Sequence, residues 1–126
     1  MTQKFFVCKH CGNMVGMIHS SGVPMICCGE KMTELVANTS DGAVEKHIPE
    51  VKVDGNKVYV NVGSVPHPMV EAHYIGWIYV KTNEGGHRKD LVVPNEAKVE
   101  IALNEGEVVS EVYAYCNLHG LWKKEI

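Results

Sequence analysis

Five cysteines and seven histidines are the residues of this chain best suited to chemistry, and the cysteines fall into two groups. Four of them lie near the N-terminus, as Cys8-x-x-Cys11 and the adjacent pair Cys27-Cys28. The fifth, Cys116, stands near the other end, three residues before His119. Four thiolates complete the tetrahedral shell of a metal ion, so Cys116 is left over for separate chemistry.

The four N-terminal cysteines have the spacing of a closed metal site. Cys8 and Cys11 are three apart, which lets both sulfurs converge on one ion from a tight turn. Adjacent residues on a strand point to opposite faces, so Cys27 and Cys28 reach the same ion only if the backbone bends sharply, which Gly29 permits. A disulfide and a purely structural zinc site are the alternatives, and the spacing does not choose iron over zinc.

Charge limits what such a site does. Four thiolates around ferric iron give a net charge of minus one, and around ferrous iron minus two, with every coordination position filled. The site would repel an anionic substrate. It is therefore suited to passing electrons or holding the fold rather than to catalysis.

Four histidines are the candidate partners of Cys116, namely His47, His67, His73 and His119. Prolines on both sides of His67 restrict its backbone to extended values and place it on a loop, which presets a ligand. Each histidine alone is typical of a surface or satisfied core residue, but together with Cys116 they favour a second metal site. Four imidazoles and one thiolate would fill five positions and leave a sixth for a substrate.

The same donor set determines the charge of this second site. Four neutral imidazoles and one thiolate leave ferrous iron with a net charge of plus one and ferric iron with plus two, so the open position attracts a small anion. Glu45 and Lys46 immediately precede His47 and are candidates for acting beside the metal. A solvated surface pair is the alternative for such a dipeptide.

Short strands must position these residues. Period-two alternation of apolar residues begins after the polar stretch 38–42 and is interrupted by turn signals at 54–56, 83–86 and 104–106. The alternating runs are Val51 and Val53; Val58, Val60 and Val62; Ile75, Trp77 and Tyr79; Val99, Ile101 and Leu103; and Val108, Val112, Ala114 and Cys116. A further apolar run, 91–93, is broken by Pro94. Six or seven short strands, with no helical periodicity beyond a turn or two, predict a mainly β protein with an immunoglobulin-like antiparallel β-sandwich.

Two domains are expected, 1–36 and 37–126. The first has too few large apolar side chains for a core of its own and needs a metal staple. The whole chain has 126 residues, of which 45% are apolar and 21% charged, as in a soluble globular protein. No apolar run is long enough for a signal peptide or a membrane span, so we expect a cytoplasmic protein with no membrane association. The mild net charge of -3, with basic residues scattered, argues against nucleic acid as a partner.

The motifs are together similar to those of one family. They are Cys8-x-x-Cys11, Cys27-Cys28, Glu45-Lys46-His47, the segment from Gly63 to Met69, His73 and Cys116-Asn117-Leu118-His119. These resemble desulfoferrodoxin, the two-iron form of superoxide reductase, over nearly the whole chain. The resemblance implies a desulforedoxin-like first domain and an immunoglobulin-like catalytic domain. It also implies a homodimer and a rubredoxin-like electron donor.

The resemblance assigns each site residue a role. It makes Cys8, Cys11, Cys27 and Cys28 the ligands of an Fe(Cys)4 centre. An Fe(His)4(Cys) centre would have His47, His67, His73 and His119 as equatorial ligands and Cys116 as the axial one. Lys46 would draw superoxide in and help deliver a proton, and Glu45 would be a sixth ligand of the oxidised iron.

The implied reaction is one-electron reduction of superoxide. Superoxide takes one electron and two protons and leaves as hydrogen peroxide, which protects against oxidative stress. A thiolate opposite the open position pushes electron density towards the bound substrate, which favours reduction. Two other functions stay open from the residues alone: a superoxide dismutase, and a zinc-stabilised electron carrier or binding protein without catalysis.

Overall fold

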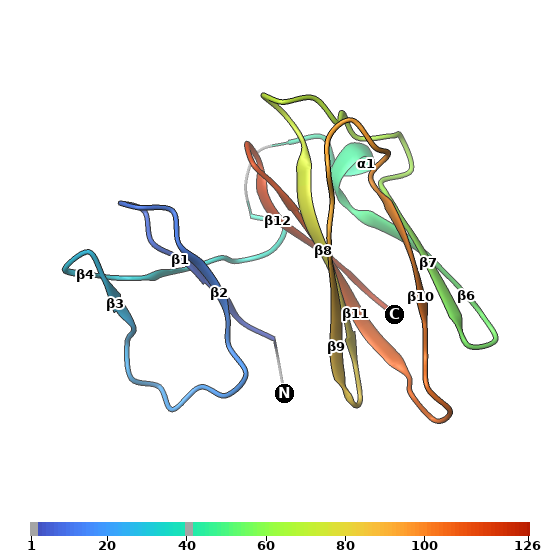
Figure 1. The fold of residues 1–126 in the computed structure, drawn as a ribbon, viewed down its shortest axis with the longest axis horizontal. Coiled ribbons are helices and arrows are strands. Elements are labelled where there is room, and N and C mark those ends of the chain that lie inside the picture. The colour runs from blue at the N-terminus through green and yellow to red at the C-terminus, as the bar shows by residue number, and fades with distance from the viewer. Residues whose placement is uncertain (1–2, 40–41) are drawn as a thin grey trace. The chain divides into compact units, whose positions relative to one another are not determined.

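The computed structural model describes residues 3–39 and 42–126 (Figure 1). Within the chain, Met1–Val36 and Ala37–Ile126 form two compact units. Ser40 and Asp41, which belong to the predicted polar stretch, lie outside the described residues. In the described part of the chain, no helix has the length and apolar character needed to cross a membrane.

The first unit consists of very short strands. They are β1 (Phe5–Val7), β2 (Met14–Gly16), β3 (Ile26–Cys27), β4 (Glu30–Lys31) and β5 (Thr33–Glu34). Strand β1 lies between β2 and β5 in one sheet, and β3 pairs with β4 in a separate hairpin. Phe5 and Cys8 are the buried apolar residues among those described in this unit, whereas Ile18 is 97% exposed. So small a core agrees with the prediction that a metal stabilises it.

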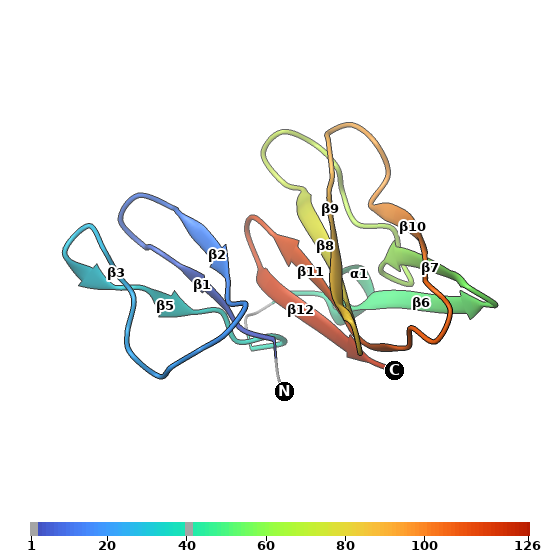
Figure 2. The ribbon, with the colours of Figure 1, turned by 60° about the horizontal axis from the view of Figure 1, so that its bottom comes forward.

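The second unit is an antiparallel sandwich of seven strands within the described residues (Figure 2). The strands are β6 (Pro49–Asp54), β7 (Lys57–Val62), β8 (Ile75–Thr82), β9 (Gly85–Asp90), β10 (Lys98–Ala102), β11 (Val109–Cys116) and β12 (Gly120–Glu125). One sheet has the order β10-β7-β6 and the other β12-β11-β8-β9. A single helical turn, α1 (Val44–His47), precedes β6. The predicted fold class, a mainly β chain with an immunoglobulin-like sandwich, is confirmed.

The predicted hairpin is present as β6 and β7. The two strands pair in antiparallel register across a turn in which Gly55 has φ +61°, a left-handed conformation that glycine adopts without strain. Val58, Val60 and Val62 alternate into the core and are at most 2% exposed. Every buried residue of the core cluster belongs to this second unit, so it folds around apolar packing rather than around a metal alone.

Two β-bulges correct the predicted faces of β8 and β11. The register with β8 shifts between Val109 and Glu111, which turns Val109 into the core and leaves Val108 63% exposed, although the alternation had predicted Val108 on the buried face. A second shift lies at the Cys116 end, where Ile75 pairs with Cys116. Because a bulge adds one residue, it reverses which side chains point inwards, so Ile75 is buried while Trp77 lies on the opposite, half-buried face.

Two strands had little or no apolar signal in the sequence. Strand β9 is polar along its whole length and lies at the edge of its sheet, where charged residues discourage pairing with another chain. Strand β12 is the other edge, and its signal is limited to Leu121 and Trp122. The apolar run 91–93, by contrast, is not a strand.

Candidate metal centres

The four N-terminal cysteines meet at one point. Their sulfur atoms all lie within 4.8 Å of one another, and no cysteine of the chain forms a disulfide. The sulfurs of Cys11 and Cys27 are 3.6 Å apart. Four sulfurs at about 2.3 Å from a common ion in tetrahedral geometry would be about 3.8 Å apart, so the spacing fits a metal.

The sharp bend predicted at the adjacent cysteines is confirmed. Cys28 and Gly29 have φ values of +53° and +76° and form the two-residue turn between β3 and β4. Two successive left-handed residues are typical of the tight turns that match the twist of a hairpin. This turn directs the sulfurs of Cys27 and Cys28 to the same side.

The electrostatics of this cluster also favour a cation. The Cys11 backbone N–H, 3.5 Å from the Cys8 sulfur, lowers the pKa of that thiol to about 6. Interactions with the sulfurs of Cys11 and Cys8 raise the pKa of Cys28 to about 12. Four thiolates cannot share so small a space without a positive charge between them.

The second cluster draws its residues from separate elements of the sandwich. His47 ends α1, His67 lies on the loop after β7, His73 precedes β8, and Cys116 ends β11. The possible ligand atoms of these four residues all lie within 4.8 Å of one another. His119, in the turn between β11 and β12, joins them, with its Nδ1 3.1 Å from His47 Nε2 and 3.7 Å from the Cys116 sulfur.

The four imidazoles form a square. Neighbouring ring centroids are separated by 4.7 Å (His47 and His67), 4.6 Å (His67 and His73), 5.2 Å (His73 and His119) and 4.8 Å (His119 and His47). The diagonal from His47 to His73 is longer, at 6.4 Å. Nitrogens at right angles on bonds of about 2.1 Å would be about 3.0 Å apart, close to the separations of His47 Nε2 from its two neighbours, 3.1 Å and 3.2 Å.

The ring nitrogens inside the square have lone pairs to offer. His47 Nδ1 lies 2.7 Å from the Ala43 carbonyl and His67 Nδ1 lies 2.7 Å from the Pro68 carbonyl, so each ring donates its proton outwards. The two Nε2 atoms, 3.2 Å apart, therefore face each other without a proton between them in the neutral rings. A cation between them turns this repulsion into coordination.

His73 independently indicates that a cation binds between the imidazoles. Its Nε2 is buried and has no hydrogen-bond partner among the described residues, an uncommon and costly state for a polar atom. Burial lowers the pKa of His47 and His73, and that of His67 to about 4, so these rings stay neutral and able to bind a metal at physiological pH. The residues present thus fit an ion held by four imidazoles and the buried Cys116 thiol.

Comparison with known proteins identifies the family. The desulfoferrodoxin family model matches residues 39–125. A desulfoferrodoxin homolog of Archaeoglobus fulgidus is 44% identical over 118 residues, covering 94% of this chain and 93% of the relative. The chain belongs to the desulfoferrodoxin family. The desulfoferrodoxin of Nitratidesulfovibrio vulgaris is 41% identical over 122 residues, covering 97% and 95% of the two chains.

A solved structure extends this likeness to the fold. The superoxide reductase from Treponema pallidum superposes with a TM-score of 0.84 at 39% sequence identity, covering 99% of this chain and 100% of that one. Membership of the desulfoferrodoxin family and the two donor clusters agree with two iron ions per chain, as predicted.

The two residues predicted to act beside the metal lie exposed on α1. Glu45 and Lys46 precede His47, and the Glu45 carbonyl accepts hydrogen bonds from the Val65 N–H at 2.8 Å and the Ser64 hydroxyl at 3.2 Å. The loop that carries His67 thereby holds α1 in place. The Glu45 carboxylate is not part of the donor cluster.

Trp122 contributes to this desulfoferrodoxin site in a way that the sequence had not shown. Its ring stacks on His47 with centroids 4.8 Å apart, and its Nε1–H donates to the His119 carbonyl at 3.1 Å. Trp122 is 2% exposed, so its side chain is buried as well as stacked. The signal in the sequence that could have indicated this contact was the position of Trp122 three residues after His119.

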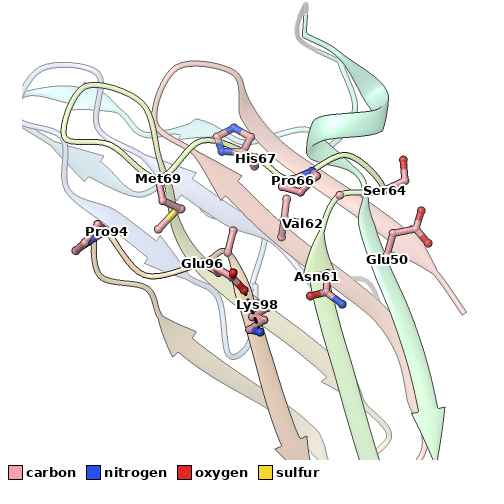
Figure 3. Close-up of a pocket in the computed structure, with 12 residues that line it drawn as sticks. Glu50, Asn61, Val62, Ser64, Pro66, His67, Met69, Pro94, Glu96 and Lys98 are labelled. Atoms are coloured by element: carbon pink, nitrogen blue, oxygen red, sulfur yellow. Dashed lines mark ion pairs between the residues drawn. The ribbon is translucent and has the colours of Figure 1, made fainter.

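A pocket of about 750 Å³ adjoins the loop that carries His67 (Figure 3). It lies among the ends of β6 and β7 and the segment that leads into β10, and His67 is the one member of the donor set among the described residues that line it. Glu50 and Glu96 contribute carboxylates, and Lys98 is paired with Glu96 at 2.9 Å. With an excess of negative charge, this pocket is poorly suited to an anionic substrate.

Proposed function

We propose that this protein is a superoxide reductase, which converts superoxide to hydrogen peroxide at an iron ion held by His47, His67, His73, His119 and Cys116. The observation that carries the proposal is the square of four imidazoles beside a buried thiol. Iron bound there would supply the electron, passing from the ferrous to the ferric state. The relatives named superoxide reductase support the choice of substrate.

The protein's own residues define the charge and rigidity of the site. Four neutral rings and one thiolate offset only one positive charge of the metal, so a small anion is attracted. The carbonyls of Ala43 and Pro68 fix the rings of His47 and His67 through their Nδ1–H groups, and Trp122 covers one face of His47. Little rearrangement is then needed during the reaction.

Lys46 is the residue we propose for guiding the substrate. Its ammonium group is exposed on α1, and among the described residues no carboxylate forms an ion pair with it. An unpaired positive charge beside the site raises the rate of encounter with an anion. From the same place, Lys46 Nζ would pass a proton to the product through water, and Glu45 would supply a carboxylate ligand to ferric iron.

The four-cysteine centre would hold the first unit together and store an electron. Such a centre is suited to this role because a closed thiolate site passes electrons without binding substrate. A rubredoxin-like donor would reduce the protein. A homodimer would cover Ile18, Val23 and Ile26, which are 97%, 72% and 63% exposed in the first unit. Five free thiols suit the reducing cytoplasm.

Oxygen and peroxide yields test the proposed function. Iron-loaded protein, reduced anaerobically and then exposed to a pulse of superoxide, should form one hydrogen peroxide per superoxide consumed and release no oxygen from the enzymatic reaction. Oxygen release at half the superoxide consumed would indicate a dismutase instead. Zinc in the four-cysteine site and no metal at the histidines would indicate an electron carrier or binding protein.

A further inference from the structure

Asn117 forms three hydrogen bonds that bracket His73. Its backbone N–H donates to the Tyr74 carbonyl at 3.1 Å, and its side-chain Oδ1 accepts from the Tyr74 N–H at 2.9 Å. Its Nδ2 donates to the Ala72 carbonyl at 3.1 Å. One side chain thus holds the residue on each side of His73 and joins both to the neighbour of Cys116.

His73 depends on this anchoring more than His47 and His67 do. His47 and His67 are each fixed by a 2.7 Å hydrogen bond from the ring to a carbonyl. Within residues 3–39 and 42–126, no such hydrogen bond to a carbonyl holds the ring of His73, whose buried Nε2 also has no partner. The direction of its ring is therefore set by the backbone, which is closed into a tight turn by two 3.0 Å hydrogen bonds with Val70 and then attached by Asn117.

We propose that Asn117 is a positioning residue of the histidine and thiolate centre. By holding His73 against the loop of Cys116, it fixes the separation between the His73 ring and the Cys116 sulfur. This inference rests on the proposed function, because it concerns the same five-ligand site. Groups that orient metal ligands without touching the metal typically change metal affinity by about 10- to 100-fold.

The chain contains a matched control, Asn83. Its Nδ2 donates to the Gly106 carbonyl at 3.1 Å and its Oδ1 accepts from the Val108 N–H at 2.7 Å, while its backbone N–H donates to the Val108 carbonyl at 3.1 Å. The same three bonds as at Asn117 are thus made at the opposite end of β8, about 23 Å along the strand from Ile75. Changing either asparagine to alanine deletes two side-chain hydrogen bonds.

The experiment compares wild type, Asn117→Ala, Asn117→Asp and Asn83→Ala as full-length chains. Each is titrated anaerobically with ferrous iron in competition with a chromophoric chelator, and visible absorption is recorded after oxidation. We expect Asn117→Ala to lower the iron affinity of the five-ligand site at least tenfold and to shift its thiolate-to-iron band, with the four-cysteine spectrum unchanged. Asn83→Ala should lose similar thermal stability and keep the wild-type affinity and band.

Asn117→Asp keeps the acceptor for the Tyr74 N–H and loses the donor to Ala72, so its affinity should fall between those of wild type and Asn117→Ala. If Asn117→Ala does not fold, Asn117→Asp decides: a reduced affinity supports the inference and a wild-type affinity overturns it. Wild-type affinity and band in Asn117→Ala, or an equal loss in Asn83→Ala, would also overturn it.

The wild-type titration separates this inference from the proposed function. Iron uptake without superoxide reduction would overturn the proposed function alone, since the effect of Asn117 on affinity is read without turnover. No iron uptake at the five-ligand site would overturn both.

Discussion

Single residues determine both the charge around the candidate centre and the polar contacts far from it. The sequence indicated the candidate donors because prolines hold His67 on a loop, because Cys116 was left over from the four-cysteine group, and because the motifs resemble those of desulfoferrodoxin. It did not show which ring nitrogen each histidine uses, since that depends on carbonyls such as that of Ala43, which only the folded chain brings within 2.7 Å. The stacking of Trp122 on His47 was hidden for the same reason.

Lys46→Gln should slow the reaction with superoxide. Removing the exposed positive charge from α1 weakens the attraction of the anion, so we expect a second-order rate constant up to about tenfold lower, with a weaker dependence on salt. Pulse radiolysis at several ionic strengths measures both. Lys52→Gln, on an exposed position of β6, is the control and should change neither. Equal effects of the two changes would rule out local guidance by Lys46.

Glu107, at the end of β8 that lies away from the histidine and thiolate cluster, should make the stability of the protein depend on pH. Its buried carboxylate accepts from the Thr82 hydroxyl at 2.7 Å and the Asn104 N–H at 3.0 Å, and it lies 2.8 Å from His87 Nε2. These contacts lower its pKa from 4.5 to about 2. A lowered folded-state pKa stabilises the protein above 4.5, and that stabilisation is lost as pH falls towards 2.

Glu107→Gln should therefore lower the unfolding temperature at pH 7, and the difference from wild type should shrink below pH 4.5. Thermal unfolding followed by circular dichroism between pH 7 and 2.5 measures this. Glu105→Gln, an exposed change on the same loop, should have little effect at any pH. A difference for Glu107→Gln that stays constant with pH would contradict the assignment.

Apolar alternation predicted most strands of the sandwich but not their irregularities. A bulge reverses the facing of every later residue, and nothing in the alternation of Val108 with Val112 marks the extra residue at Ser110. Strand β9 is formed by pairing with β8 at an edge, so it needs no apolar face and gave no signal. Metal-ligand spacing, which survives such shifts, was the better guide to the site.

Gly63→Ala should displace α1. A Cβ at this position would lie 2.6 Å from the Glu45 carbonyl oxygen and 2.9 Å from that of Ile48, so the backbone of α1 would have to move. We expect a loss of about 1–3 kcal/mol in the free energy of unfolding, together with weaker iron binding because His47 ends α1. Denaturant unfolding and iron titration measure the two effects.

Gly76→Ala provides the comparison for that change. A Cβ there would meet Tyr74 at 3.8 Å and Tyr115 at 4.0 Å, which are ordinary contacts, so both the unfolding free energy and the iron affinity should stay near wild type. If Gly63→Ala behaved like Gly76→Ala, the packing of the His67 loop on α1 would not matter for the site.

The two units of the chain should depend on metal to different degrees. The second has a continuous apolar core, whereas the first buries little more than Phe5 and Cys8 among its described residues. Removing the metal ions with a chelator should therefore abolish amide protection in Met1–Val36 and leave it largely intact in the strands of Ala37–Ile126. Hydrogen exchange resolved by residue measures this. Retained protection in the first unit would mean that its strands are stable without a metal.

Locating the iron ions is the decisive test of the two proposed centres. A crystal of the iron-loaded protein, with anomalous diffraction collected at the iron absorption edge, locates each ion without assumptions about its ligands. We predict one peak among the sulfurs of the four N-terminal cysteines. A second should lie about 2.1 Å from a nitrogen of each of His47, His67, His73 and His119 and within bonding distance of the Cys116 sulfur. A second peak elsewhere, or one beyond bonding distance of that sulfur, would contradict this prediction.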